Sequence, residues 1–262
     1  MPQARKRFGQ HFLHDNNIID RIILAIDPRE NDRLLEIGPG RGALTFPLLE
    51  KCKRLTAVEL DRDLVPLLLR KVKDNEQLEV INADILKFDL GNLGGSEPLR
   101  IVGNLPYNIS TPLMFHLLDS ISLIQDMHFM VQKEVAQRIV AEPNNRDYGR
   151  LSVMIQYHCQ CQYLFDVAPE SFTPPPRVDS AIIRMKHYPE PAATVDDFQL
   201  FSKIVQTAFN QRRKTIANSL KSIITAETIE IAGIDRRMRA ENLSLQDYIG
   251  LTRTALKLKQ ND

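Results

Sequence analysis

The sequence lacks a long apolar run and a paired set of cysteines. No stretch of its 262 residues approaches the ~18 apolar residues of a membrane span, and the amino terminus shows no signal-peptide core. We therefore expect a cytoplasmic protein without a membrane segment. Its three cysteines, Cys52, Cys159 and Cys161, do not have the paired spacing of a metal site. We predict no metal, no disulfide and no thiol chemistry.

The chain also lacks an excess of charge of either sign. There are 34 Lys and Arg residues against 33 Asp and Glu residues, so the formal net charge is only +1. This balance is not that of a strongly basic nucleic-acid binder, and any basic surface must therefore be local. The hydrophobic share of 43% is ample for a buried core. The length suits one large domain, or one large and one small domain.

Short apolar runs alternate with amphipathic stretches through the first half of the chain. We predict buried strands at residues 33–38, 54–59, 78–81, 99–103 and 127–131. A helix is predicted at residues 61–73, where leucines mark one face. Strands that alternate with helices indicate an α/β fold, in which a parallel sheet has helices on both faces.

The pattern changes after Gly149. Residues 151–157 suit either a helix or a strand, whereas residues 163–167 and 178–188 are predicted strands that complete the sheet as an antiparallel edge hairpin. Residues 189–194 resemble a linker. Apolar residues then recur at helical spacing, namely Phe198, Phe201, Ile204, Val205 and Ala208. We expect one domain over residues 1–190 and a small all-helical domain over residues 195–262.

A glycine-rich turn, Gly38-Pro39-Gly40-Arg41-Gly42, directly follows the first predicted strand. Glycines at this point let the backbone approach a ligand closely. A dinucleotide site is the obvious rival, but its fingerprint is Gly-x-Gly-x-x-Gly, and the spacing here is Gly-x-Gly-x-Gly. Pro39 also removes a backbone N–H that a pyrophosphate would use. The turn therefore favours S-adenosylmethionine as the cofactor.

Two carboxylates follow the next two strands. Glu59 is placed to accept hydrogen bonds from both ribose hydroxyls, a feature that NAD sites share. Asp84 is placed to accept from an adenine amino group. Either residue alone is equally well read as a solvated carboxylate at the end of a strand. Together, and in register with Gly38 and Gly40, they support a site for the methyl donor.

The tetrapeptide Asn104-Leu105-Pro106-Tyr107 ends the fourth predicted strand, at the edge where ligands bind in open α/β sheets. The Asn104 side-chain oxygen and the Leu105 carbonyl can accept the two hydrogens of an amino group that is conjugated to an aromatic ring. This frees the nitrogen lone pair to attack a sulfonium methyl. Pro106 restricts Leu105 to extended geometry, and Tyr107 offers a stacking face. A plain strand-to-turn ending is the alternative, and the acceptor remains open.

Further ordered segments accompany these motifs. They are RKRFGQHFL at 5–13, EIGPG at 36–40, ELD at 59–61, NLPYNISTP at 104–112, QKEV at 132–135, YGRLSV at 148–153, FTPPPRVDS at 172–180 and RRKT at 212–215. On these segments the chain resembles, nearly end to end, the ribosomal RNA adenine dimethyltransferases, and most closely their bacterial small-subunit branch.

The resemblance implies a Rossmann-like, seven-stranded S-adenosylmethionine-dependent methyltransferase sheet over residues 1–190. It also implies a helical rRNA-binding domain over residues 195–262. The expected reaction places two methyl groups on each of two adjacent adenosines, in a hairpin loop near the 3′ end of 16S rRNA. The expected substrate is a pre-30S ribosomal particle late in small-subunit assembly, and we expect the enzyme to act as a monomer.

By position, the resemblance implies methyl-donor contacts at His11, Leu13, Gly38, Glu59, Asp84 and Asn104. It assigns the target base to Asn104, Tyr107 and Phe172. Many relatives carry Asn where this chain has His11. Phe172, which precedes three stiff prolines, could form a second stacking face opposite Tyr107, and simple core packing is the alternative.

Three basic clusters are candidates for RNA contacts. Arg5, Lys6 and Arg7 form an arm suited to phosphate groups. Arg212, Arg213 and Lys214 lie in the helical domain, as do the basic residues within 236–239. Such clusters are often only solvated helix faces. Other readings of the whole chain are a large-subunit adenine methyltransferase, an RNA-binding assembly or transcription factor, and an NAD-dependent dehydrogenase.

Overall fold

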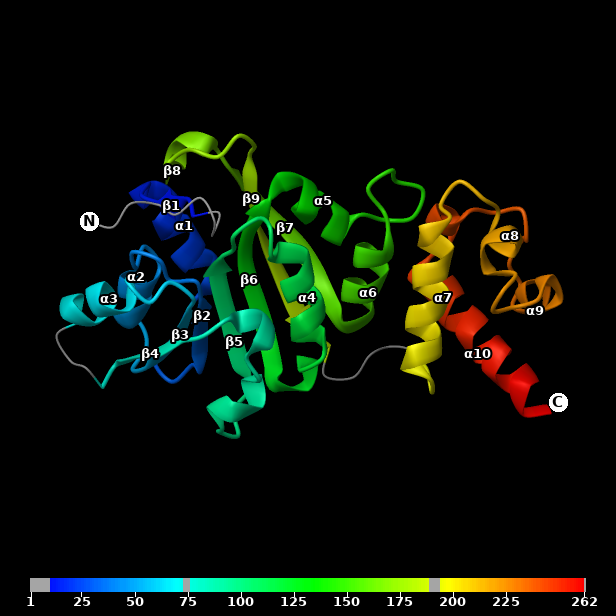
Figure 1. The fold of residues 1–262 in the computed structure, drawn as a ribbon, viewed down its shortest axis with the longest axis horizontal. Helices are drawn as coiled ribbons and strands as arrows, with labels where there is room; N and C mark the ends of the chain where they lie inside the picture. The colour runs from blue at the N-terminus through cyan, green and yellow to red at the C-terminus, as the bar shows by residue number, and fades with distance from the viewer. Residues whose placement is uncertain (1–9, 73–75, 189–193, 262) are drawn as a thin grey trace. The chain divides into compact units, whose positions relative to one another are not determined.

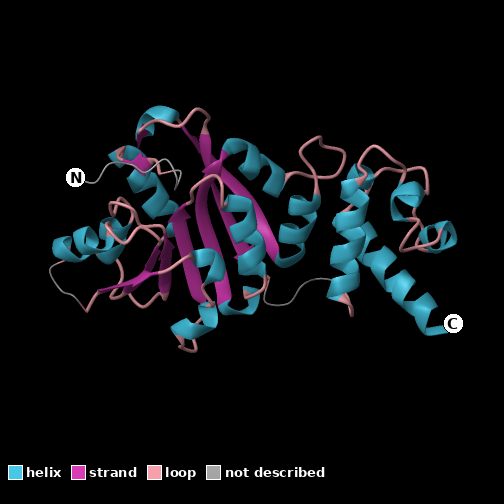
Figure 2. Cartoon of the chain, viewed as in Figure 1, coloured by secondary structure: helices cyan, strands magenta, loops and turns pink. Residues whose placement is uncertain are grey.

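The computed structural model describes residues 10–72, 76–188 and 194–261, and it divides into two compact units (Figure 1). Unit 1 consists of Met1–Ala136 and Gln160–His187, and unit 2 consists of Gln137–Cys159 and Tyr188–Asp262. Unit 1 contains the β-sheet, whereas the described part of unit 2 is helical (Figure 2).

A seven-stranded sheet with the strand order β4-β3-β2-β5-β6-β9-β7 organises unit 1 (Figure 1). The strands are β2 (Leu34–Ile37), β3 (Leu55–Glu59), β4 (Leu78–Asn82), β5 (Leu99–Asn104), β6 (Ile124–Gln132), β7 (Cys159–Val167) and β9 (Ser180–His187). The strands from β4 to β6 are parallel, and β9 is antiparallel to β6. The predicted α/β sheet is confirmed. The two strands predicted for its edge are β7 and β9, and β9 lies between β6 and β7.

Among the described residues, the α-helices that accompany the sheet strands in the first part of the chain are α1 (Asn16–Ile26), α2 (Thr45–Leu49), α3 (Val65–Lys71), α4 (Ser110–Leu118) and α5 (Lys133–Val140). The Asp15 carboxylate caps α1 by accepting from the Asn17 amide at 3.0 Å. The helix predicted at residues 61–73 is shorter in the structure. It begins at Val65, and Pro66 occupies the first turn, where a missing N–H costs nothing.

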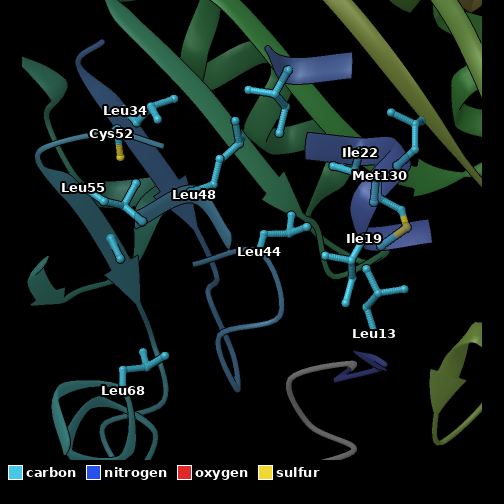
Figure 3. Packing of buried hydrophobic residues seen from close by; sticks show 14 of the residues in the cluster. Leu13, Ile19, Ile22, Leu34, Leu44, Leu48, Cys52, Leu55, Leu68 and Met130 are labelled. Atoms are coloured by element: carbon cyan, nitrogen blue, oxygen red, sulfur yellow. The ribbon is translucent and has the colours of Figure 1, made fainter. Parts of the chain in front are cut away.

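One hydrophobic cluster of unit 1 lies on the face of the sheet that α1, α2 and α3 cover. Figure 3 shows Leu34, Leu48 and Leu55 in one part of this cluster, and Ile19, Ile22 and Met130 gathered in another. The opposite face is covered too, because Leu35 and Ile101, whose side chains alternate with those of the first face, are completely buried. A sheet buried on both faces explains the continuous apolar runs of its strands.

A second, two-stranded sheet joins β1 (Phe12–Leu13) to β8 (Phe172–Thr173). Leu13 lies opposite Phe172 in the antiparallel register, and the His14 amide donates to the Ser171 carbonyl at 3.0 Å. The Ser171 hydroxyl also donates to Asp15 at 3.1 Å. This pairing, which the sequence did not predict, fixes the segment that follows the amino-terminal arm.

Unit 2 consists of α6 (Arg150–His158), α7 (Phe198–Asn210), α8 (Ile216–Leu220), α9 (Ala226–Ile231) and α10 (Leu245–Asn261) among its described residues. Residues 151–157, for which the sequence left two choices, are helical. This helix packs against α7 and α10, and the Tyr157 ring contacts Phe198 and Phe201. Unit 2 therefore includes residues 137–159. The domain boundary predicted from the sequence placed these residues in the larger domain, residues 1–190. Apart from Thr194, the proposed linker lies outside the described residues.

Cys52, Cys159 and Cys161 are in the thiol form, and Cys52 and Cys159 are buried. Burial raises the pKa of Cys52 to about 11 and that of Cys159 to about 12, so both thiols stay protonated at neutral pH. Within the described ranges, no helix combines the length and the apolar character needed to cross a bilayer.

Candidate active site

The carboxyl ends of β2, β3, β4 and β5 surround one cavity of about 360 Å³. Its lining includes every residue predicted to contact the methyl donor, together with the whole tetrapeptide: His11, Leu13, Gly38, Gly40, Glu59, Asp84, Asn104, Leu105, Pro106 and Tyr107. Parallel strands bring their carboxyl ends to the same edge of a sheet, and this is why residues from four separate motifs meet here.

The glycine turn takes a backbone conformation that other residues adopt only with strain. Gly38 has a φ of 66° and Gly40 a φ of 60°, both in the left-handed region. The Gly38 amide donates to the Val58 carbonyl at 2.9 Å, which ties the turn to β3. A side chain at Gly40 would touch the Phe12 ring at 3.4 Å. The turn is thus pressed between β3 and the β1 segment.

Glu59 is fixed at the end of β3 by two backbone amides. One carboxylate oxygen accepts from Gly40 at 3.0 Å and the other from Asp61 at 2.8 Å. Burial raises the pKa of Glu59, and these two hydrogen bonds oppose that effect. Each oxygen has a further lone pair. The held carboxylate can therefore accept from a pair of ligand hydroxyls.

Asp84 caps the short 3₁₀ helix at Ile85–Lys87. Its carboxylate accepts from the Leu86 amide at 3.1 Å, and this hydrogen bond fixes the side chain at the cavity wall. A carboxylate in this position can accept from an exocyclic amino group.

Glu36 lines the same cavity, a position that was not predicted from the sequence. Its side chain is only 2% exposed and accepts from the Thr45 hydroxyl at 2.6 Å. Burial raises its pKa to about 8, the Thr45 hydrogen bond lowers it, and the nearby Glu59 charge raises it further. An acidic residue inside the apolar run Leu34-Leu35-Glu36-Ile37 was the signal that could have identified it.

Asn104 is oriented by the segment that follows the amino-terminal arm. Its side-chain amide nitrogen donates to the His11 carbonyl at 3.0 Å, which leaves the side-chain oxygen as the acceptor. The next residue, Leu105, is 1% exposed, and its amide donates to the Met130 carbonyl at 3.0 Å. The start of the tetrapeptide is therefore anchored both to His11, the residue before β1, and to β6.

Tyr107 has its ring stacked on His11, with the ring centroids 5.6 Å apart and the planes 23° apart. Its hydroxyl shares a hydrogen bond of 2.7 Å with Ser180. Burial raises the pKa of Tyr107, so the phenol is neutral at physiological pH. The His11 Nδ1 atom lies 2.7 Å from the Pro174 carbonyl oxygen. The aromatic partner of Tyr107 is thus His11.

Phe172 is not brought to the cavity. Its side chain is 2% exposed and belongs to the unit 1 core, where it lies opposite Leu13 in the β1–β8 register. A stacking role opposite Tyr107 would require the ring to leave this packing.

Of the predicted RNA contacts, Arg5, Lys6 and Arg7 lie outside the described residues. In unit 2, Arg212 forms an ion pair with Glu241, whereas Arg213 and Lys214 are exposed. The second basic segment lies beside them, because the Ile216 amide donates to the Met238 carbonyl at 2.6 Å.

Comparison with known proteins identifies the family. The model of the family described as ribosomal RNA adenine dimethylase matches residues 1–256. The chain belongs to this family. This dimethylase is therefore an S-adenosylmethionine-dependent methyltransferase that acts on adenine in ribosomal RNA, and the expectation drawn from the resemblance is confirmed.

Two relatives of this dimethylase are named ribosomal RNA small subunit methyltransferase A. The protein from Alcanivorax borkumensis is 54% identical over 250 residues, which cover 95% of this chain and 89% of the relative. The protein from Pseudomonas aeruginosa is 52% identical over 260 residues, which cover 99% and 97%.

Two solved structures are similar over nearly the whole dimethylase chain. A dimethyladenosine transferase from Plasmodium falciparum aligns with a TM-score of 0.81 and 25% identity, and the match covers 95% of this chain and 98% of that one. The 23S rRNA methyltransferase ErmE aligns with a TM-score of 0.74 and 27% identity, covering 93% and 99%. The predicted methyltransferase fold is thereby confirmed.

The cavity suits this cofactor chemically. S-adenosylmethionine carries a sulfonium and an ammonium group, and the cavity wall presents the carboxylates of Glu59 and Asp84. The glycine turn lets the backbone approach the ligand at close range. The described residues therefore accommodate the methyl donor of the family.

Proposed function

We propose that this dimethylase methylates two adjacent adenosines in a hairpin loop of small-subunit rRNA, on a pre-30S particle in the cytoplasm, and that it works as a monomer. The observation that carries this proposal is the grouping of Glu59, Asp84 and Asn104 around one cavity, in a chain more than half identical to two small-subunit enzymes. We infer the small subunit as the target from the names of those relatives, and the geometry of the cavity supports methyl transfer.

The methyl-donor half of the site is built from three motifs. We propose that Glu59 accepts from the ribose hydroxyls, because the Gly40 and Asp61 amides hold its two oxygens in place. Asp84 accepts from the adenine amino group. His11, Leu13, Gly38 and Gly40 complete the wall, and Asn104 closes it. When bound, S-adenosylmethionine supplies a methyl group activated by its sulfonium. The fixed carboxylates and the backbone of the glycine turn then hold the methyl donor in the orientation needed for transfer.

The target half of the site uses the tetrapeptide. The Asn104 side-chain oxygen and the Leu105 carbonyl accept the two hydrogens of the adenine amino group, which frees the nitrogen lone pair for in-line attack. Pro106 aims that carbonyl, and Tyr107 stacks on the base. The nitrogen becomes acidic only when methylation has made it cationic, so its proton passes to water or a carbonyl and no strong base is needed. Preorganised dipoles carry the catalysis.

Binding of RNA is assigned to the arm and to the helical domain over residues 195–262. The arm residues Arg5, Lys6 and Arg7 and the helical residues Arg213 and Lys214 are suited to phosphate contacts, which position the RNA without reading its bases. Arg212 contributes less as a free charge, because it is paired with Glu241. Flipping an adenine into the cavity costs a few kcal/mol of unstacking, which such contacts can offset.

The experiment supplies labelled S-adenosylmethionine and small ribosomal subunits from a strain without this methylation. Nucleosides are then quantified by mass spectrometry. We expect dimethyladenosine in small subunits and none in large subunits tested in parallel. Absence of the product from small subunits, with binding of the methyl donor intact, would overturn the proposal. Product confined to large subunits would favour the large-subunit alternative.

The timing of the reaction is tested with the same assay. Naked rRNA, pre-30S particles and mature subunits are compared at equal concentration. We expect the pre-30S particle to give the highest kcat/KM. An equal or higher value on mature subunits would contradict a role late in assembly.

A further inference from the structure

We propose that Arg41 binds the carboxylate of the amino-acid end of S-adenosylmethionine. The inference rests on the proposed placement of the methyl donor in this cavity. Neither the glycine-turn motif nor the tetrapeptide assigns Arg41 a function, because the turn depends on its glycines and the variable position between them is unconstrained.

The charges around the cavity support a carboxylate-binding role for Arg41. Two of the cavity's lining side chains are carboxylates held by backbone amides, namely Glu59 and Asp84. Among the described lining residues, Arg41 is the one with a permanent positive charge. The methyl donor has a carboxylate as well as two cationic groups. The carboxylates of Glu59 and Asp84 repel the ligand carboxylate, whereas the cationic Arg41 attracts it.

The position of Arg41 beside the glycine turn also supports this role. It directly follows Gly40, whose amide is bonded to the proposed ribose ligand Glu59 at 3.0 Å. The Arg41 guanidinium carbon lies 4.1 Å from the centre of the Phe12 ring. Phe12 is itself 8% exposed and packs within 3.4 Å of the Cβ position at Gly40. A buried aromatic ring therefore holds the cation beside the glycine turn.

A guanidinium group can stack on Phe12 and bind a carboxylate at the same time. Stacking on an aromatic ring uses the flat face of the group, whereas a carboxylate binds along its edge through two parallel N–H donors. Phe12 also restricts the side chain before the ligand arrives, so less conformational entropy is lost on binding. A lysine in this position would keep the charge but would lose the two-pronged geometry.

The test compares two probes that differ in one group: S-adenosylhomocysteine and its decarboxylated analogue S-adenosyl-3-thiopropylamine. Calorimetry measures both dissociation constants for the wild type, Arg41→Met and Arg41→Lys. We expect the wild type to prefer the carboxylate-bearing probe by about 10- to 100-fold. Arg41→Met keeps a long stem over Phe12 and should bind both probes with similar affinity. Arg41→Lys should retain part of the preference.

Several outcomes would overturn the inference. One is an Arg41→Met variant that still prefers the carboxylate-bearing probe as strongly as the wild type. Another is a variant with weakened binding to rRNA fragments and an unchanged probe preference, because Arg41 would then contact RNA phosphate. Thermal melting of Arg41→Met without ligand identifies a folding defect. If there is one, the probe preference of Arg41→Lys is compared with that of the wild type instead. No RNA enters the probe assay, so its result is independent of which subunit is methylated.

Discussion

The side-chain amide of Asn104 donates a hydrogen bond to the backbone carbonyl of His11 at 3.0 Å. His11 in turn stacks on Tyr107, and its Nδ1 atom lies 2.7 Å from the Pro174 carbonyl oxygen. The residue that begins the tetrapeptide is therefore oriented by a segment more than ninety positions earlier in the chain. Any change that shifts this segment should also shift the oxygen proposed to hold the target amino group.

Asn104→Ala should lower the rate of methyl transfer by about 10²- to 10³-fold, the usual cost of removing one preorganised dipole from an active site. Affinity for S-adenosylhomocysteine should fall by much less, because Glu59 and Asp84 remain in place. Single-turnover kinetics at saturating methyl donor and calorimetry measure the two quantities separately. Asn92→Ala, which alters an exposed asparagine in the same unit, is the control. Loss of methyl-donor binding with an unchanged chemical step would refute this assignment.

Glu59→Gln should weaken binding of the methyl donor by about 10- to 100-fold, which corresponds to the loss of a hydrogen bond to a charged group. Glutamine has one acceptor oxygen, so the Gly40 and Asp61 amides can no longer both be satisfied as they are now. KM for the methyl donor should rise, with a smaller change in kcat. Glu79→Gln removes an exposed carboxylate from the neighbouring strand and controls for charge alone. A lower kcat at unchanged KM would show that Glu59 does not bind the ligand.

The parts of the fold that follow from local pattern could be predicted from the sequence. The inner strands β2, β3, β5 and β6 contain apolar runs because a sheet covered on both faces imposes that composition. Residues 151–157 remained ambiguous for the same reason. The helix buries every residue from Leu151 to Ile155, including the polar Ser152, and a segment buried all round shows no period from which to choose helix or strand.

Contacts between distant segments could not be predicted in this way. Leu13 and Phe172 pair in a two-stranded sheet whose strands have two residues each. Strands this short leave no periodic signal in the sequence. Phe172 was predicted by resemblance to hold the target base, whereas its ring lies in the core of this structure. The candidate cavity was predictable because each of its motifs follows a strand. The Asn104–His11 hydrogen bond and the buried carboxyl of Glu36 required the three-dimensional arrangement.

Gly103→Ala should destabilise unit 1 and impair the site. A Cβ atom at this position would lie 2.6 Å from the Ile37 carbonyl oxygen, so two neighbouring backbones would have to separate. Overpacking of this kind typically costs about 1–3 kcal/mol. Urea unfolding measures the loss. Gly250→Ala is the matched control, since nothing lies within 4 Å and its helical position should gain about 0.5–1 kcal/mol. Equal stability of the two variants would contradict the close approach.

Glu36→Gln should change how stability depends on pH. Burial raises the pKa of Glu36 to about 8 in the folded protein, against 4.5 in the unfolded chain. Between these values the folded state holds a proton that the unfolded state has released. The contribution of Glu36 to stability is therefore fully present below about pH 4.5 and is lost as the pH rises towards 8. The slope is up to about 1.4 kcal/mol per pH unit.

A glutamine at position 36 does not titrate, and its carbonyl oxygen can still accept from the Thr45 hydroxyl. The free energy of unfolding of Glu36→Gln should therefore fall less steeply than that of the wild type between about pH 5 and 8, so the variant gains stability relative to the wild type as the pH rises. Urea denaturation across this range measures the difference. Glu50→Gln, at an exposed position in the same unit, controls for the removal of one carboxyl group. Parallel curves for the wild type and Glu36→Gln would show that Glu36 is ionised in the folded protein throughout, and its buried hydrogen bond to Thr45 would then be that of a carboxylate.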